Sequence, residues 1–186
     1  MGTPIDPEYL AKVLIGGIEK VAIKIADYDP NWVNLFQQHA FRIRTALNET
    51  ALRIEHIGST SVPELGAKPI IDILVAVANS ADENAYLPAL MSAGYELRVR
   101  EPDFDEHRML RTPTRDVHIH VYSLGSAEIE RNLLFRDALR EHPAERETYE
   151  RVNGDLAARD WPDMNAYADA KTQVIEEIIA RAKQSK

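Results

Sequence analysis

The sequence contains no cysteine, so disulfide bridges, thiolate metal ligands and cysteine nucleophiles are all excluded. It also lacks any apolar run that approaches the roughly 20 residues of a membrane-spanning helix. Residues 1–17 show neither the basic start nor the apolar centre of a secretion signal. We therefore expect a soluble, cytoplasmic protein with no membrane partner.

The chain has no excess of basic residues either. Its 22 Lys and Arg face 30 Asp and Glu, which leaves a net charge of −8. This balance argues against broad electrostatic binding to nucleic acid or to an anionic membrane. What is present is ordinary for a globular protein: 186 residues, 45% of them apolar and 28% charged, which is enough for one domain with a hydrophobic core.

Hydrophobic periodicity predicts a sheet-containing part followed by helices. Strands are expected over residues 21–25, 52–57, 69–77, 95–99, 109–112 and 117–122. Helices are expected over 8–14, from Asp29-Pro30 to 47, and over 82–93, 126–142, 144–158 and 164–181. The fold class is then α+β, a mixed sheet of five or six strands flanked by helices, with a helical C-terminal half.

The domain organisation follows from the same pattern. Residues 1–17 form a short lead-in, and residues 18–186 form a single domain. Within that domain, the sheet-containing part spans 18–122 and the helical part spans 123–186. The junction near Tyr122 is not rich in Gly, Pro or Ser, so it is expected to separate two parts of one domain rather than to act as a linker.

A turn of Gly58-Ser59-Thr60-Ser61 follows the predicted strand 52–57. Backbone N–H groups in such a turn can hold phosphate oxygens. Ser and Thr also end strands as ordinary turn residues. The residues alone leave both interpretations open.

Asp72 lies inside the apolar strand 69–77, on the face that it shares with Leu74 by the two-residue period. A buried carboxylate is unfavourable unless it is paired or bound to a metal. A structural partner such as Arg42, Arg44 or Lys68 would satisfy it, and so would a cation at the mouth of a cleft.

His118 and His120 lie on the same face of the strand 117–122, because Val117, Ile119 and Val121 occupy the other face. Two imidazoles so placed can share a metal or line an anion pocket. They can equally lie on a solvated sheet face beside carboxylates.

Several basic residues could clamp a phosphate, and most could also be ordinary surface charges. Lys68 precedes the Asp72 strand, and Tyr167 and Lys171 are one turn apart on the last predicted helix. The remaining candidates are Arg108, Arg111, Arg131 and Arg136.

Taken together, these residues resemble the GrpB family (UPF0157), small proteins with a nucleotidyltransferase-like fold. The motifs that carry the resemblance are YDPNW, LRIEHIGSTSVPELGAKPIIDILVAV, HIHV, LLFRDALREHP and AYADAKTQVIEEI, over about residues 20–182. GrpB-like domains also occur joined to dephospho-coenzyme A kinase, which suggests a role linked to nucleotides.

The resemblance implies a site and a mechanism. Gly58, Ser59 and Thr60 would hold the phosphates of a nucleotide, and Asp72 would be the first carboxylate of an Asp-x-Asp/Glu metal motif. Two divalent metals would stabilise the attacking and leaving oxygens. Tyr167 and Lys171 would approach the phosphates from the last helix, and Lys68 would add a positive charge.

The sequence departs from the family fold's pattern at position 74, where Leu74 replaces the second carboxylate. His118 and His120 stand where a third carboxylate is expected. Asp72 with two imidazoles could hold one cation, manganese or zinc in preference to magnesium. Glu55 could supply a replacement carboxylate, although only one of Glu55 and His56 can face the cleft.

Three hypotheses follow. The first is a metal-dependent nucleotidyltransferase-type or other phosphate-handling enzyme, with Asp72, His118 and His120 as catalytic and metal-binding residues. The second is a module that binds a nucleotide or a coenzyme A-related ligand and has lost the chemistry, as Leu74 suggests. The third is a protein whose helical part, 123–186, mediates self-association or another partner contact.

Overall fold

The computed structural model describes residues 7–19, 23–161 and 164–184. Within these ranges, five strands form one mixed sheet in the order β1-β2-β5-β4-β3. Their bounds are β1 Arg53–Ile57, β2 Ile71–Val77, β3 Glu96–Glu101, β4 His107–Arg111 and β5 Val117–Ser123. β2 and β5 are parallel, and every other neighbouring pair is antiparallel. The predicted α+β class, with its helical C-terminal half, is confirmed.

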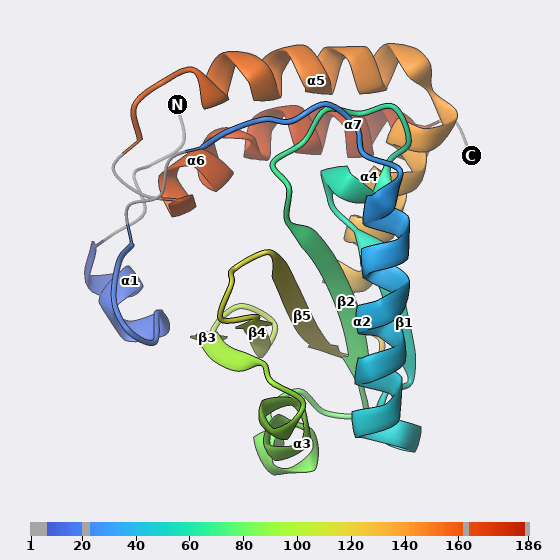
Figure 1. The fold of residues 1–186 in the computed structure, drawn as a ribbon. Coiled ribbons are helices and arrows are strands. Elements are labelled where there is room, and N and C mark those ends of the chain that lie inside the picture. The colour runs from blue at the N-terminus through green and yellow to red at the C-terminus, as the bar shows by residue number, and fades with distance from the viewer. Residues whose placement is uncertain (1–6, 20–22, 162–163, 185–186) are drawn as a thin grey trace.

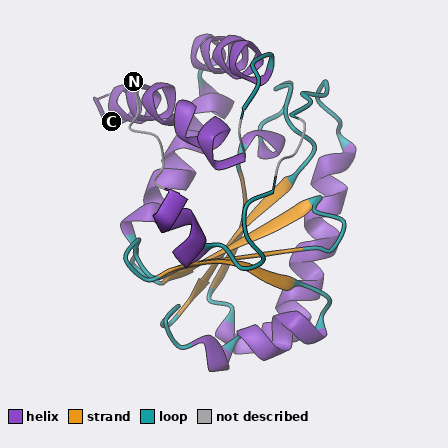
Figure 2. Ribbon diagram, turned by 90° about the vertical axis from the view of Figure 1, so that its left-hand side faces the viewer, coloured by secondary structure: helices purple, strands orange, loops and turns teal. Residues whose placement is uncertain are grey.

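Helices cover both faces of the sheet (Figure 2). Their bounds are α1 Pro7–Val13, α2 Asn31–Leu47, α3 Leu87–Ser92, α4 Ala127–Glu141, α5 Pro143–Ala157, α6 Met164–Ala170 and α7 Thr172–Gln184. In the ribbon view, α2 runs along β1 and β2, while α5, α6 and α7 lie across the top of the molecule (Figure 1). No helix in the described ranges has the length and hydropathy to cross a bilayer.

The predicted helix starts are confirmed at two caps. Asp29 Oδ1 accepts a hydrogen bond of 2.8 Å from the backbone N–H of Asn31 at the start of α2. Ser126 Oγ accepts one of 3.2 Å from the N–H of Glu128 at the start of α4. Each side chain satisfies a backbone donor that the helix itself leaves without a partner.

The strand periodicity separates two cores. Ile73, Val75, Ile119 and Val121 point to one face and pack with α2 and α3. Leu74 and Ala76 point to the other face, where they meet residues of α4. This second core covers only part of its face, and the rest is left for the pocket described below.

The predicted strand over 21–25 is wrong where the structure describes it. Residues 23–25 belong to no strand, and Ala26 forms a single antiparallel bridge with Ala67. Because the partner is a loop residue and not a strand, hydrogen bonding stops after one pair. Val21 and Ala22 lie outside the described residues.

The predicted helix over 164–181 is divided into α6 and α7. Lys171 lies between them, and its N–H donates to the carbonyl of Ala168 at 3.2 Å, an i to i−3 contact that tightens the turn. β4 also begins earlier than predicted, at His107 and not at Met109. Both differences bear on the site.

Candidate functional site

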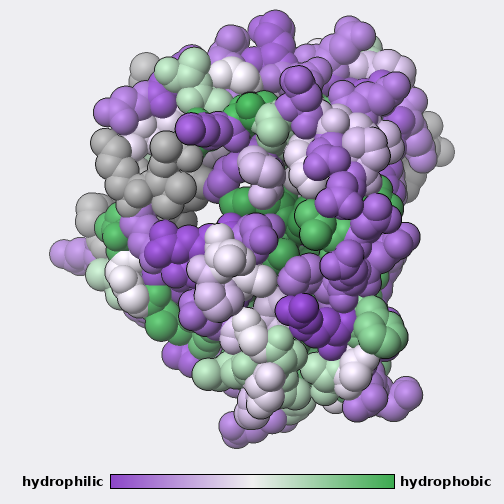
Figure 3. Space-filling view, viewed as in Figure 1, coloured by the Kyte–Doolittle hydropathy of each residue, from purple (hydrophilic) through white to green (hydrophobic). Residues whose placement is uncertain are grey.

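A pocket of about 480 Å³ lies between the sheet and the C-terminal helices. Figure 3 shows this side of the molecule hollowed near its centre. Nine of the candidate residues line the pocket: Gly58, Ser59, Thr60, Lys68, Asp72, His118, His120, Tyr167 and Lys171. Of the four candidate arginines, Arg131 also lines it, whereas Arg108, Arg111 and Arg136 do not. Segments more than 100 residues apart in the chain thus meet around one space.

Asp72, His118 and His120 form a group suited to a cation. Asp72 Oδ1 lies 3.5 Å from His118 Nδ1 and 3.4 Å from His120 Nε2. One ligand atom from each of the three residues lies within 4.8 Å of the other two. The register explains the meeting, since Asp72 pairs with His118 across the parallel β2 and β5, and His120 is two residues further along.

His118 and His120 stabilise the ionised form of Asp72. Burial raises the pKa of this carboxyl, but the hydrogen bonds and charges of His118 and His120 lower it well below its usual range. Arg44, one of the structural partners considered from the sequence, donates to the carbonyl of Ala51. Asp72 therefore faces a polar cleft as a carboxylate, which is the form that binds cations.

Gly58 brings a tight turn against this carboxylate. Its φ is +69°, in the region that favours glycine. A Cβ at this position would lie 2.5 Å from Asp72 Oδ2. Only a residue without a side chain lets the Ser59–Ser61 turn approach Asp72 so closely.

Tyr167 and Lys171 from the helical part and Lys68 from the loop before β2 also line the pocket. Lys171 Nζ lies 4.6 Å from the centre of the Tyr167 ring, and Tyr149 and Ser59 hydroxyls are hydrogen-bonded at 3.2 Å. Burial disfavours the charge on Lys171, but Tyr149, Tyr167 and Asp72 outweigh it and raise its pKa. Burial lowers the pKa of Lys68 to about 8, with Asp72 opposing this shift. Both lysines can therefore be cationic at neutral pH.

A hydrogen-bonded chain behind His120 was missed by the sequence reasoning. His120 Nδ1 lies 3.1 Å from His107 Nε2, and His107 Nδ1 lies 2.7 Å from Glu101 Oε2. Tyr9 then donates to the other Glu101 oxygen at 3.0 Å. Partners of this kind fix the ring orientation of a metal-binding histidine.

The signal for His107 was present in the sequence. His107, Met109 and Arg111 alternate along β4, and Met109 and Arg111 pair with His120 and His118. Starting the predicted strand at Met109 removed His107 from the pattern. Strand ends are set by tertiary pairing, which a single sequence does not display.

Glu55 and His56 are assigned to opposite faces. Glu55 pairs with Leu74 in the register and lies on the face of Asp72. However, its carboxylate is bound by Arg53 at 3.0 Å and by Arg136 at 2.9 Å. His56 stacks on Phe36 of α2 at 4.7 Å between ring centres, on the other face. Neither residue belongs to the cation group.

Leu74 is fully buried in the second core, with Ile57, Tyr122, Ile129 and Leu133. The position of the expected second carboxylate is thus occupied by hydrophobic packing. In the described part of the chain, the only cluster of His, Cys, Asp and Glu with cation-binding spacing is Asp72, His118 and His120.

Comparison with known proteins gives consistent results. A sequence model of the GrpB protein family matches residues 22–181. A UPF0157 protein of Halalkalibacterium halodurans is 48% identical over 97% of this chain and 93% of its own length. A UPF0157 protein of Streptomyces coelicolor is 51% identical over 95% of this chain and 92% of its own length.

One solved structure agrees with this relationship. The crystal structure of the conserved protein GrpB from Enterococcus faecalis is similar with a TM-score of 0.75 and 35% identity, over 87% of this chain and 98% of that chain. A weaker likeness, with a TM-score of 0.45 and 10% identity, is to the Cid1 poly(U) polymerase; it covers 79% of this chain and 47% of that one.

Proposed function

The chain belongs to the GrpB family, and from this premise we propose that its pocket binds a divalent cation and the phosphates of a nucleotide, as a metal-dependent phosphate-handling enzyme. The observation that supports this most strongly is the meeting of Asp72, His118 and His120 ligand atoms within 4.8 Å, beside the Gly58 turn. A carboxylate with two imidazoles favours manganese or zinc over magnesium.

Each residue then has a role. Asp72, His118 and His120 would hold the cation, which when bound would supply positive charge to a phosphoryl group. Ser59 and Thr60 present the turn to phosphate oxygens, and Lys68 and Lys171 add charge from two other sides of the pocket. The Glu101–His107 pair holds the His120 ring with its Nε2 directed at Asp72.

The test is a calorimetric titration of Mn²⁺ into the protein, alone and with a non-hydrolysable ATP analogue. We expect Asp72→Asn to weaken Mn²⁺ binding by at least about tenfold, because the charged ligand becomes a neutral amide. Asp155→Asn, an exposed carboxylate on α5, is the control and should bind as the wild type does. Equal Mn²⁺ affinity in wild type and Asp72→Asn would overturn the proposal.

Leu74 favours a second candidate, a module that binds the same ligands without turning them over. Its burial leaves one carboxylate where two-metal transfer uses a pair. Release of phosphate or pyrophosphate from a panel of nucleotides with Mn²⁺ separates the two. Sustained release that Asp72→Asn abolishes supports the enzyme, whereas tight binding without release supports the module.

A further inference from the structure

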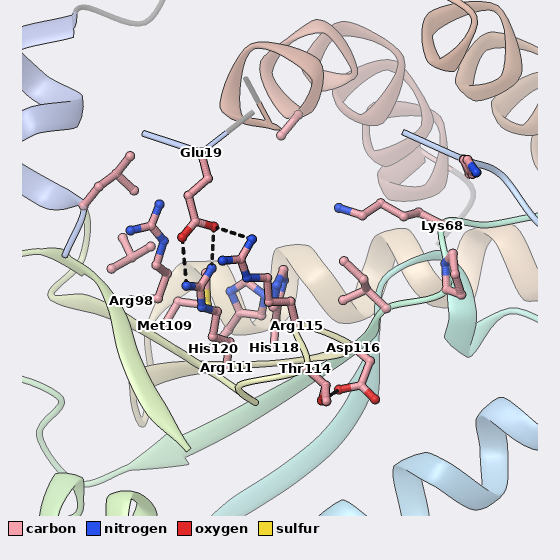
Figure 4. A pocket seen from close by; sticks show the side chains of 16 residues that line it. Glu19, Lys68, Arg98, Met109, Arg111, Thr114, Arg115, Asp116, His118 and His120 are labelled. Carbon is pink, nitrogen blue, oxygen red and sulfur yellow. Dashed lines mark hydrogen bonds and ion pairs between the residues drawn. The ribbon is translucent and has the colours of Figure 1, made fainter. Parts of the chain in front are cut away.

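A second pocket, of about 540 Å³, adjoins the first along β4 and β5 (Figure 4). His118, His120 and Lys68 line both pockets. The second pocket therefore reaches two of the three residues of the cation group, His118 and His120, and it is also lined by Met109 and Arg111 of β4. A ligand in it would approach the same cation as a phosphate held in the first pocket.

The lining of this second pocket is basic, although the chain as a whole carries −8. Among the residues that the structure describes, five cationic side chains line it, against the two carboxylates of Glu19 and Asp116; the cations are Lys24, Lys68, Arg98, Arg111 and Arg115. Asp116 accepts hydrogen bonds of 2.6 Å from the hydroxyls of Thr112 and Thr114. A basic concavity of this kind attracts an anionic ligand.

Arg111 and Arg115 both contact the carboxylate of Glu19. Arg111 holds its carboxylate with two parallel hydrogen bonds of 2.8 and 3.0 Å, and Arg115 lies 3.2 Å away. Figure 4 shows Glu19 reaching from the opposite wall to both guanidinium groups. This is the two-pronged geometry in which arginine binds a planar carboxylate. Arg111 Nε is buried, and the described part of the chain offers it no acceptor.

The sheet register places this carboxylate site beside the cation group. Arg111 pairs with His118, and His118 pairs with Asp72, so the three stand in one row across β4, β5 and β2. With strands about 4.8 Å apart, the Cα atoms of Arg111 and Asp72 are roughly 10 Å apart. A molecule of that length can touch both.

The backbone of Arg115 is in a strained conformation. Its φ of +63° lies in the left-handed region, where a glycine would be less strained. The turn nevertheless carries an arginine whose guanidinium meets Glu19. The strained backbone supports a binding role for this side chain.

We propose that Arg111 and Arg115 bind the carboxylate of a second, small organic substrate, and that Glu19 occupies this place until the substrate displaces it. The proposal rests on the proposed function for the neighbouring cation group. The apolar walls, which include Leu14, Ile70, Val99 and Met109, suit a hydrocarbon body between the carboxylate and the end that reaches the cation.

The test uses hexanoate as the probe, with neutral hexanamide and inorganic phosphate as comparison ligands, in calorimetry without metal or nucleotide. Glu19→Gln removes the internal competitor's charge, so hexanoate should bind this variant at least about tenfold more tightly than the wild type. A double variant that combines Glu19→Gln with Arg111→Gln should lose this increase in hexanoate affinity. Glu49→Gln removes one negative charge at an exposed site distant in sequence and should not reproduce it.

Equal hexanoate affinity in wild type and Glu19→Gln overturns the proposal. Equal or tighter binding of phosphate or hexanamide overturns the carboxylate class. If Arg111→Gln fails to fold, Arg115→Gln serves in its place, since its side chain is 51% exposed. Because these titrations contain no metal, a failure of Mn²⁺ binding would overturn the proposed function and leave this result intact.

Discussion

At Gly58, the absence of a side chain decides whether the turn and the carboxylate can coexist. The neighbouring Asp72 oxygen lies where a Cβ would be. The backbone, with φ +69° and ψ −177°, is also nearly restricted to glycine. One residue thus carries both a conformational and a steric requirement.

We expect Gly58→Ala to destabilise the fold by about 1–3 kcal/mol from backbone strain and to weaken Mn²⁺ binding as well, because the new methyl group displaces Asp72. Gly125→Ala is the matched control, since Gly125 also has a positive φ, of +93°, but a methyl group added there would have nothing within 4 Å. Urea unfolding and Mn²⁺ calorimetry measure the two effects. Unchanged Mn²⁺ affinity in Gly58→Ala would contradict this account of the turn.

His107 contacts His120 but is not itself one of the three residues of the cation group. His107→Phe keeps the ring that stacks on Tyr122, at 4.8 Å between ring centres, and removes both hydrogen bonds. We expect Mn²⁺ affinity to fall by about 10- to 100-fold, the usual effect of losing such a partner. His39→Phe, which breaks the contact with Tyr95 on the other face, should leave Mn²⁺ affinity unchanged. If the two variants behave alike, His107 is not a positioning residue.

At the scale of elements, β1 places Glu55 and His56 on opposite faces. The packing of β1 against α2 encloses His56, which is 6% exposed and stacked on Phe36. Burial lowers the pKa of His56 to about 4, against the opposing charge of Asp72. The contact between β1 and α2 therefore requires the neutral imidazole.

This packing predicts a dependence of stability on pH. Between pH 6.5 and 4, the unfolded chain binds a proton at His56 that the folded chain excludes. The free energy of unfolding therefore falls by about 3 kcal/mol as the pH is lowered from 6.5 to 4. Urea unfolding at pH 7, 6, 5 and 4 measures it. His56→Phe should reduce the dependence of the free energy of unfolding on pH. His142→Gln, at an exposed position, should leave that dependence unchanged. Equal slopes in all three proteins would show that His56 is not the source.

At the scale of the whole molecule, the loop that carries the Gly58 turn packs the sheet-containing part against the helical part. Val62 and Leu65 from this loop are fully buried against α4, α5 and α7, in one core with Leu139, Tyr149 and Ile178. The sheet-containing and helical parts consequently share a hydrophobic core, and we predict that they unfold together.

The two tryptophans test this directly, because Trp32 of α2 lies in the core between that helix and the sheet, and Trp161 donates to the carbonyl of Leu156 in the helical part. Trp32→Phe and Trp161→Phe each leave one tryptophan as a fluorescence reporter. We expect each variant to unfold in a single fluorescence transition that coincides with the transition measured by circular dichroism. Leu65→Ala should destabilise by about 2–5 kcal/mol and lower both reporters' midpoints together. Separate midpoints would mean that the two parts unfold independently.

Much of this protein was determined by local sequence. The two-residue alternation in Ile71–Val77 and Val117–Ser123 fixed which residues share a face, so Asp72, His118 and His120 could be named from the sequence. The caps at Asp29 and Ser126 likewise follow from side chains that bond within two residues of themselves. Such features depend on neighbours along the chain and are readable there.

Only the tertiary structure decided what depends on partners distant in sequence. The alternation at 21–25 does not become a strand, because no strand lies beside the part that the structure describes. The pairing of Arg111 with His118, and the reach of Glu19 to Arg111 across 92 residues, arise from the sheet order. Pairing and desolvation are collective, so the second pocket and the Glu101–His107 chain appear only once the fold is formed.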